Sequence, residues 1–149
     1  MIITENKIEL RIPTREDIDF LIREAQDSET KFLRDFCCKN EIEPYDFLNE
    51  WSKENIVLCV EDKPIYLAAL IENTLGQIEL WTVVVTDVTN LITLCKYSKR
   101  VLKDWVKKYK EIYATMLRFD EENRKFVGWL GFEKIGEDAN YITYVLKGE

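Results

Sequence analysis

The residues that could carry out chemistry in this chain are carboxylates, tyrosines and cysteines, because the sequence contains no histidine. A Ser-His or Cys-His nucleophile system is therefore excluded. Glu79 lies in the strand-like run QIELWTVVVT, where a carboxylate can act as a general base through a water molecule. The alternative for such a carboxylate is a solvated or salt-bridged structural role. Tyr97, Tyr141 and Tyr144 are candidate general acids, and each also suits packing at its position.

The four cysteines give no signal for a metal site or a disulfide framework. Zinc sites use two closely spaced cysteine pairs, or cysteines combined with histidines. Cys37 and Cys38 are adjacent, Cys59 lies in the apolar run IVLCV, and Cys95 stands apart from the others. A small buried side chain is the ordinary interpretation of Cys59. We expect no bound metal, and no disulfide framework in a reducing compartment.

Composition and charge favour a single folded domain covering residues 1–149. The chain is 46% hydrophobic and 12% aromatic, which is unlike a disordered, highly charged chain. Its net charge of −7 argues against a nucleic-acid partner, because an acidic surface repels phosphate. No apolar run approaches the ~18 residues of a membrane span, and the start MIITENKIEL does not resemble a signal peptide. We expect a cytoplasmic protein with no nucleic-acid or membrane partner.

The first third of the chain predicts one strand followed by helices. In residues 7–13 apolar and charged side chains alternate, as in a half-buried strand. Thr14 is expected to cap a helix, with Asp17 completing a capping box. A second helix is predicted within residues 27–40, and a third, opened by a proline, across residues 43–54.

The rest of the chain predicts strands on either side of one long helix. A tight antiparallel pair is followed by a β-branched strand with the profile of a central strand covered on both faces. The long helix carries apolar side chains at helical spacing and many Lys and Arg residues on its opposite face. The predicted elements are strands 55–62, 64–72 and 77–86, helix 90–110, strand 111–119, helix 120–130, and a final strand within 133–147 that turns as a hairpin near 136–140.

The order of these elements resembles that of the GNAT (Gcn5-related N-acetyltransferase) superfamily. The most specific local feature is WLGFEKIGE (residues 129–137), because the short fourth helix of that family commonly closes with an apolar residue, Gly-Phe and a strand. Gly131 is expected just past the helix end, where a positive φ is common. The resemblance covers essentially the whole chain. It implies a mixed α/β fold with a central, mostly antiparallel sheet and about four flanking helices.

The resemblance also implies an acyltransferase reaction in which acetyl-CoA acetylates a small-molecule or peptide amine. In the family, two neighbouring strands splay apart, backbone groups of one bind the pantetheine arm, and the pyrophosphate lies at the start of the next helix. Glu79 then becomes the candidate base and Tyr97 a candidate acid. The candidate cofactor-binding residues are Thr82, Val83, Val84, Thr89, Asn90, Lys96 and Asp120.

Two features depart from the family pattern. The turn expected to face the phosphates, residues 87–93, lacks the glycines that allow close backbone approach, and Asp87 would repel phosphate. In the short helix, Asp120 takes the usual place of an Asn, and Val127 that of a frequent Tyr general acid. Both departures lower the expectation of ordinary acetyl transfer.

A narrower resemblance gives a second hypothesis. GNAT-like proteins encoded by bacteriophages, including internal virion proteins of short-tailed phages, look similar in the basic helix without a glycine loop and in the run NRKFVGWLG. This implies a catalytically inactive virion or protein-interaction protein, with phage structural proteins as partners and a location in the host cytoplasm or the virion. The closing strand, with Tyr141 and Tyr144, also offers a surface for a homodimer. Both functions stay open at this point.

Overall fold

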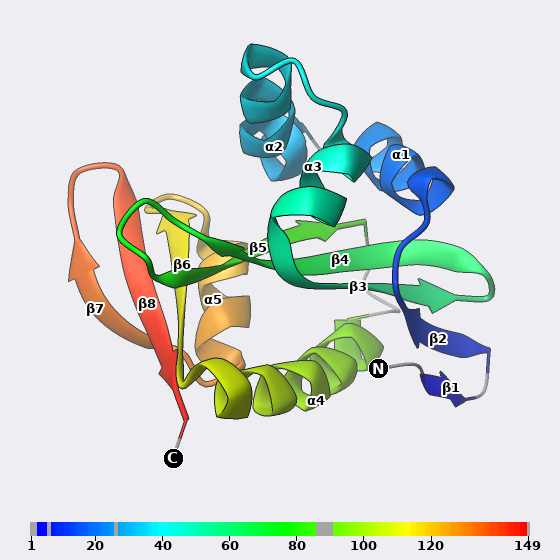
Figure 1. Cartoon of the computed structure of the whole chain (residues 1–149). Helices are drawn as coiled ribbons and strands as arrows, with labels where there is room; N and C mark the ends of the chain where they lie inside the picture. The colour runs from blue at the N-terminus through cyan, green and yellow to red at the C-terminus, as the bar shows by residue number, and fades with distance from the viewer. Residues whose placement is uncertain (1–2, 6, 26, 86–90, 149) are drawn as a thin grey trace. The chain divides into compact units, whose positions relative to one another are not determined.

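The helices and strands follow the predicted order, with one additional strand near the N-terminus (Figure 1). The computed structural model describes residues 3–5, 7–25, 27–85 and 91–148. The described helices are α1 (Arg15–Glu24), α2 (Asp27–Lys39), α3 (Pro44–Trp51), α4 (Leu91–Tyr109) and α5 (Glu121–Trp129). The described strands are β1 (Ile3–Glu5), β2 (Ile8–Arg11), β3 (Ser52–Val60), β4 (Lys63–Glu72), β5 (Ile78–Val84), β6 (Glu111–Leu117), β7 (Glu133–Glu137) and β8 (Tyr141–Lys147).

The strands form a mixed, mostly antiparallel sheet, as predicted. Hydrogen-bonded neighbours follow the order β1-β2-β3-β4-β5-β6-β8-β7. The pairs β1–β2, β2–β3, β3–β4, β6–β8 and β7–β8 are antiparallel, whereas β5 and β6 run parallel. With α1–α5, this arrangement confirms the predicted fold class.

The chain divides into two compact units. The first unit comprises residues 1–71 and 81–91, and the second comprises residues 72–80 and 92–149. Strand β5 contributes its first residues to the second unit and the remainder to the first. A single domain over residues 1–149 stays a prediction.

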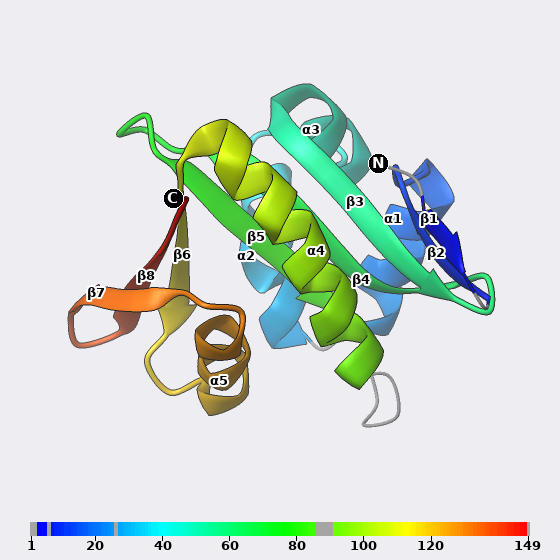
Figure 2. The ribbon, with the colours of Figure 1, turned by 90° about the horizontal axis from the view of Figure 1, so that it is seen from below.

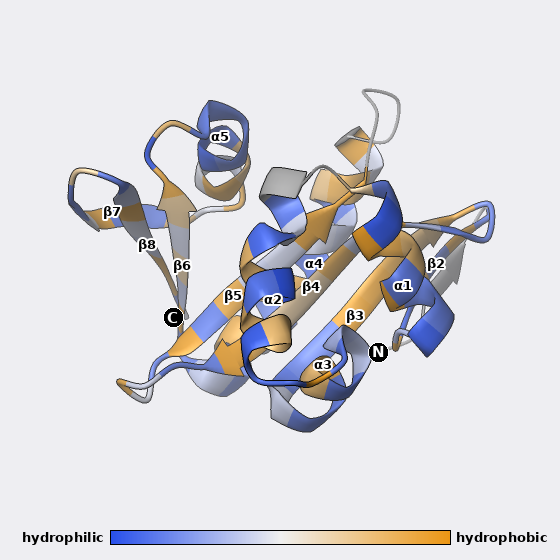
Figure 3. Cartoon of the chain, turned by 90° about the horizontal axis from the view of Figure 1, so that it is seen from above, coloured by the Kyte–Doolittle hydropathy of each residue, from blue (hydrophilic) through white to orange (hydrophobic). Residues whose placement is uncertain are grey.

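The core of the first unit lies between α1–α3 and one face of β3, β4 and the end of β5 (Figure 3). Its buried side chains are Ile18, Leu21, Leu33, Cys37, Phe47, Leu48, Val57, Cys59, Leu67, Ala69, Ile71 and Val83.

The predicted capping box is present at the N-terminus of α1. The backbone N–H of Asp17 donates to Thr14 Oγ1 at 3.2 Å, and the Asp17 carboxylate accepts from the Thr14 N–H at 2.8 Å.

The boundary between α3 and β3 differs from the prediction. The helix ends at Trp51 instead of continuing to residue 54, and Ser52 already pairs with Ile71 of β4. Sheet pairing therefore overrides the helical sequence pattern at this point. The β3–β4 turn also differs from the prediction. Two residues, Glu61 and Asp62, with φ of 52° and 65°, separate the strands where one residue, Lys63, was expected.

In the second unit, α5 contacts β6, and β8 pairs with both β6 and β7 (Figure 2). The predicted helix stop is confirmed, since Gly131 has φ of +102° and follows the C-cap of α5. The N–H of Phe132 donates to the Val127 carbonyl at 3.2 Å, and the N–H of Gly131 donates to the Gly128 carbonyl at 3.1 Å. These two bonds form a Schellman motif. Val127 and Phe132 are both buried, so the stop also anchors the helix to its core.

Candidate active site

Strand β5 keeps a single register against β4. The N–H of Asn73 donates to the Gln77 carbonyl at 2.9 Å, and the N–H of Val85 donates to the Ile65 carbonyl at 2.7 Å. Gln77 and Val85 flank β5 and lie eight residues apart, and their partners Asn73, directly after β4, and Ile65, within β4, also lie eight residues apart. The two strands therefore stay in the same register between these two hydrogen bonds. Because backbone groups of successive residues point to opposite strand edges, odd-numbered residues of β5 face β4.

The even-numbered residues of β5 direct their backbone groups to the opposite edge, where β6 pairs. Within the described part of the chain, the register between β5 and β6 consists of the single pair Glu79↔Tyr113. In contrast, β6 and β8 pair over seven residues. Thr82 and Val84 lie beyond the pair with β6, so the N–H and C=O groups of both residues form a strand edge that can bind a ligand.

Side chains on β5 alternate between the two faces of the strand. Glu79, Trp81 and Val83 share one face, and Val83 is 4% exposed within the core of the first unit. Of the three predicted pantetheine-binding residues, Thr82 and Val84 thus present backbone groups at the β6 edge. Val83 turns its backbone groups towards β4 and its side chain into the core.

The Glu79 carboxylate is oriented by Asn73, a residue that the sequence did not single out. Asn73 Nδ2 donates to Glu79 Oε2 at 3.4 Å and to Gln77 Oε1 at 3.3 Å. Asn73 Oδ1 accepts the backbone N–H groups of Leu75 and Gln77, both at 3.0 Å. The β4–β5 turn therefore fixes the amide that holds Glu79. The asparagine opening the NTLG turn was the available signal.

The other predicted residues lie on α4 and α5. Tyr97 is buried, with 2% of its surface exposed, whereas Lys96 is exposed and its Nζ lies 5.4 Å from the centre of the Tyr97 ring. Asp120 caps α5, since its carboxylate accepts the backbone N–H of Asn123 at 3.2 Å. Thr89 and Asn90 fall outside the described residues, as does most of the turn that contains them.

The alternative acids on β8 differ in exposure. Tyr141 is 47% exposed, whereas Tyr144 is 7% exposed and its hydroxyl accepts a hydrogen bond from Arg124 Nε at 3.3 Å. The guanidinium of Arg124 therefore has a raised pKa, caused mainly by this hydrogen bond. Neither tyrosine forms a described contact with Glu79, and the candidate acid role of both stays a prediction.

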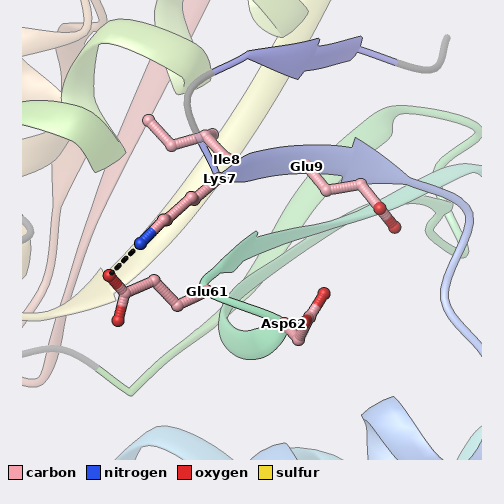
Figure 4. Close-up of a pocket in the computed structure, with 5 residues that line it drawn as sticks. All are labelled: Lys7, Ile8, Glu9, Glu61 and Asp62. Atoms are coloured by element: carbon pink, nitrogen blue, oxygen red, sulfur yellow. Dashed lines mark ion pairs between the residues drawn. The ribbon is translucent and has the colours of Figure 1, made fainter.

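A recess between β2 and the β3–β4 turn is lined by Lys7, Ile8, Glu9, Glu61 and Asp62 (Figure 4). Its ion pair joins Lys7 Nζ and Glu61 Oε1 at 3.8 Å, with both side chains more than two-thirds exposed. Such a pair is well solvated and weak. The recess contains no residue of β5.

Across the described residues, no group of three or more His, Cys, Asp or Glu side chains could hold a metal ion. No described helix is long and apolar enough to cross a membrane.

Solved structures match the chain, although no protein-family model and no curated protein does. Ribosomal-protein-S5-alanine acetyltransferase from Vibrio fischeri matches with a TM-score of 0.68 and 12% identity, covering 99% of this chain and 96% of that one. A GNAT-family acetyltransferase from Bacillus anthracis matches with a TM-score of 0.67 and 12% identity over 99% and 98% of the two chains. PaiA N-acetyltransferase from Thermoplasma acidophilum, in complex with coenzyme A, gives a TM-score of 0.67 and 18% identity over 95% and 99%.

These identities establish likeness of fold, and they leave the narrower kinship with phage proteins a prediction. The likeness spans nearly the full length of this chain and of each matched structure. This chain has the fold of the GNAT acetyltransferases.

Proposed function

We propose that this chain is an acetyl-CoA-dependent N-acetyltransferase acting on an amine. The observation that carries the proposal is the single β5–β6 pair at Glu79↔Tyr113. It leaves the backbone groups of Thr82 and Val84 along a strand edge, where the amides of an extended pantetheine arm can pair as another strand would. The GNAT fold supports the same cofactor, since a matched structure of that fold contains coenzyme A.

Glu79 is the proposed general base. It is half-buried on β5, and the amide of Asn73 limits its rotation. When bound, acetyl-CoA supplies an activated acetyl thioester. Glu79 takes the proton of the amine through a water molecule, the nitrogen forms a bond to the acetyl carbon, and the carbon–sulfur bond breaks. Tyr97 is the proposed donor of a proton to the leaving sulfur, which requires an approach to its buried hydroxyl.

The phosphate end of the cofactor is assigned to the N-terminal part of α4. Lys96 presents an exposed ammonium there, and Thr89 and Asn90 stay predicted contacts. Asp120 is proposed to act by holding the first turn of α5, since its carboxylate is already engaged as a cap.

A catalytically inactive virion or interaction protein is the second candidate. The glycine-free sequence of residues 87–93 favours it, because side chains there hinder close approach of phosphates. In this case the partners would be phage structural proteins, and the protein would be recovered with purified particles.

Calorimetric titration with acetyl-CoA separates the two candidates. The enzyme requires saturable binding and a melting temperature that rises with cofactor concentration by mass action. Glu79→Gln should bind acetyl-CoA like the original chain and lose turnover. Absence of any response at millimolar acetyl-CoA would exclude the enzyme and leave the second candidate.

A further inference from the structure

A recess of the second unit is formed by residues of α5 and β8. Its lining residues are Glu121, Arg124, Lys125 and Tyr144. The first three occupy positions i, i+3 and i+4 of α5, so their side chains share one side of the helix. The recess has a volume of about 300 Å³, at the lower end of the range for small-molecule sites. We call it the α5 recess.

The guanidinium of Arg124 is positioned from two sides. Its Nε donates to the Tyr144 hydroxyl at 3.3 Å, and its Nη1 donates to the Arg118 carbonyl at 3.0 Å. A guanidinium carries five N–H donors, and these bonds use two of them. Among the residues that the structure describes, Arg124 forms no ion pair. The α5 recess therefore contains a positioned cation with donors still to be used.

The Tyr144 hydroxyl supplies a further donor to the α5 recess. Tyr144 is 7% exposed, and its oxygen already accepts the hydrogen bond from Arg124. Within the described part of the chain, no group accepts the proton of this hydroxyl. Tyrosine hydroxyls can both accept and donate, and buried ones usually find a partner. A ligand with an acceptor oxygen in the recess would complete the pairing.

The charges that line the α5 recess favour a ligand with a single negative charge. Arg124 and Lys125 are cations and Glu121 is a carboxylate, which gives a net charge of +1. Glu137, whose charge also acts on Arg124, is paired with Lys134 Nζ at 2.8 Å. A second negative charge on the ligand would be repelled by Glu121. A carboxylate therefore fits the recess better than a phosphate dianion does.

We infer that the α5 recess is a binding site for the carboxylate group of a small organic acid. The guanidinium of Arg124 donates to the two carboxylate oxygens, in the paired arrangement that arginine forms with carboxylates. The Tyr144 hydroxyl donates to one of these oxygens, and the Lys125 ammonium adds attraction. A carboxylate has about four lone-pair positions, so it can accept all of these donors. No residue with a role in the proposed acetyl transfer lines the recess, so the inference is independent of that function.

The test is an NMR titration of the isotope-labelled full chain, without cofactor, with propionate at constant ionic strength. Propionamide is the matched probe, because it has the same shape and no charge. We expect propionate to shift the amide signals of residues 121–125 and the Nε signal of Arg124 until they saturate. Propionamide should bind at least about tenfold more weakly, because it lacks the charge that pairs with the guanidinium. Equal affinity for the two probes, or no saturable response to propionate, would overturn the inference.

Methyl phosphate tests the choice of a carboxylate. It is mainly a dianion at pH 7 and should bind more weakly than propionate, because Glu121 repels its second charge. Glu121→Gln should remove this repulsion and improve methyl phosphate relative to propionate by about threefold. This variant gains affinity, so a folding defect cannot produce the expected result. Tighter binding of methyl phosphate than of propionate to the original chain, or an unchanged ratio in Glu121→Gln, would overturn the assignment.

Variants of the donors locate the binding. Arg124→Lys keeps the charge and removes the paired donors, so propionate should bind about tenfold more weakly. Tyr144→Phe removes only the hydroxyl and should weaken binding about fivefold. Lys125→Gln should weaken it about twofold, and Lys147→Gln, at an exposed lysine of β8, is the matched control that should leave it unchanged.

The amide spectrum and the melting temperature verify that each variant is folded. Unchanged affinity for propionate in both Arg124→Lys and Tyr144→Phe would overturn the inference. A loss in Lys147→Gln as large as that in Arg124→Lys would do so as well, because the response would then reflect the charge of the whole unit.

Discussion

The two compact units differ in charge although they share strand β5. The first unit contains 17 Asp and Glu against 9 Lys and Arg, a net charge of −8. The second contains 11 against 12, a net charge of +1. The chain's net charge of −7 is therefore concentrated in one unit, and the total alone describes neither unit well. A ligand class that is excluded from the net charge of a whole chain is excluded only for the average surface. A local anion-binding surface can still be present.

The difference between the units matches the two ligands of the proposed reaction. In the first unit, the excess of carboxylates suits a cationic amine. In the second, the exposed bases of α4 suit the phosphates of a cofactor. These bases are Lys96, Lys99, Arg100, Lys103, Lys107 and Lys108.

Glu79→Gln should reduce kcat by about 100-fold or more, because the variant retains the size of the side chain and loses the base. Affinity for acetyl-CoA should stay unchanged, since the proposed contacts of Thr82 and Val84 with the cofactor use backbone groups. Steady-state kinetics and calorimetry measure the two quantities. Glu133→Gln, an exposed carboxylate on β7, is the control. Retained turnover in Glu79→Gln would remove this residue from the mechanism.

Arg11→Met should lower the free energy of unfolding by about 2 kcal/mol at pH 7, because it leaves a buried carboxylate without its cation. Arg11 binds both oxygens of Asp17, with Nη2 at 2.9 Å from Oδ1. The control Lys31→Met removes an exposed ion pair with Asp35 and should cost less than about 0.5 kcal/mol. Urea titration measures both. Equal effects would show that the Arg11–Asp17 pair contributes no more than a solvated one.

The same pair predicts a pH dependence. Burial alone would raise the pKa of Asp17, but hydrogen bonds from Arg11 and Thr14 outweigh burial and hold the pKa below its ordinary value. The stabilisation is therefore complete above the unfolded pKa of about 3.9 and is lost as the pH falls through the lower folded pKa. The difference in unfolding free energy between the original chain and Arg11→Met should shrink below pH 4. A constant difference down to pH 2 would contradict this linkage.

Gly131→Ala should cost about 1 kcal/mol, because φ of +102° strains any residue with a Cβ atom. Gly128→Ala is a control with the opposite expected sign. Gly128 lies within α5, and an added Cβ would meet nothing within 4 Å, so alanine should stabilise the helix by about 0.5–1 kcal/mol. Thermal unfolding measures both variants. If Gly131→Ala and Gly128→Ala lowered the stability equally, the positive φ of Gly131 at the helix stop would not explain the effect.

Lys96→Ala should weaken acetyl-CoA binding by about threefold, the modest effect of one solvated charge. The loss should diminish at high salt, since screening already weakens the attraction to phosphate. Lys63→Ala, an exposed lysine of the first unit, is the control. Calorimetry at low and high salt measures the affinities. An equal loss in the control would show that α4 does not provide the phosphate contact.

Features fixed by near neighbours in the chain were predicted well. The capping box of Thr14 and Asp17 and the stop at Gly131 each depend on hydrogen bonds that span only a few residues. The end of α3 could not be predicted in this way. Ser52 leaves the helical pattern because it pairs with Ile71, nineteen residues further along the chain.

The site shows the same limit. A strand containing Glu79, Trp81 and Thr82 was predicted from its β-branched residues. Its register against β4 could not be predicted, because it is set by backbone hydrogen bonds such as that from Val85 to Ile65. By helical spacing Trp51 falls on the same side of α3 as Phe47, yet Trp51 is 63% exposed whereas Phe47 is 2% exposed.

By itself the sequence determined the order of helices and strands apart from β1, the excess of acidic residues and the absence of histidine chemistry, because composition and local periodicity are sufficient for these. Only the tertiary structure decided that β5 pairs with β6 at a single residue and that rings from α2, α3 and β5 meet. Both depend on segments far apart in the chain, and their packing is set by the whole core rather than by any one segment.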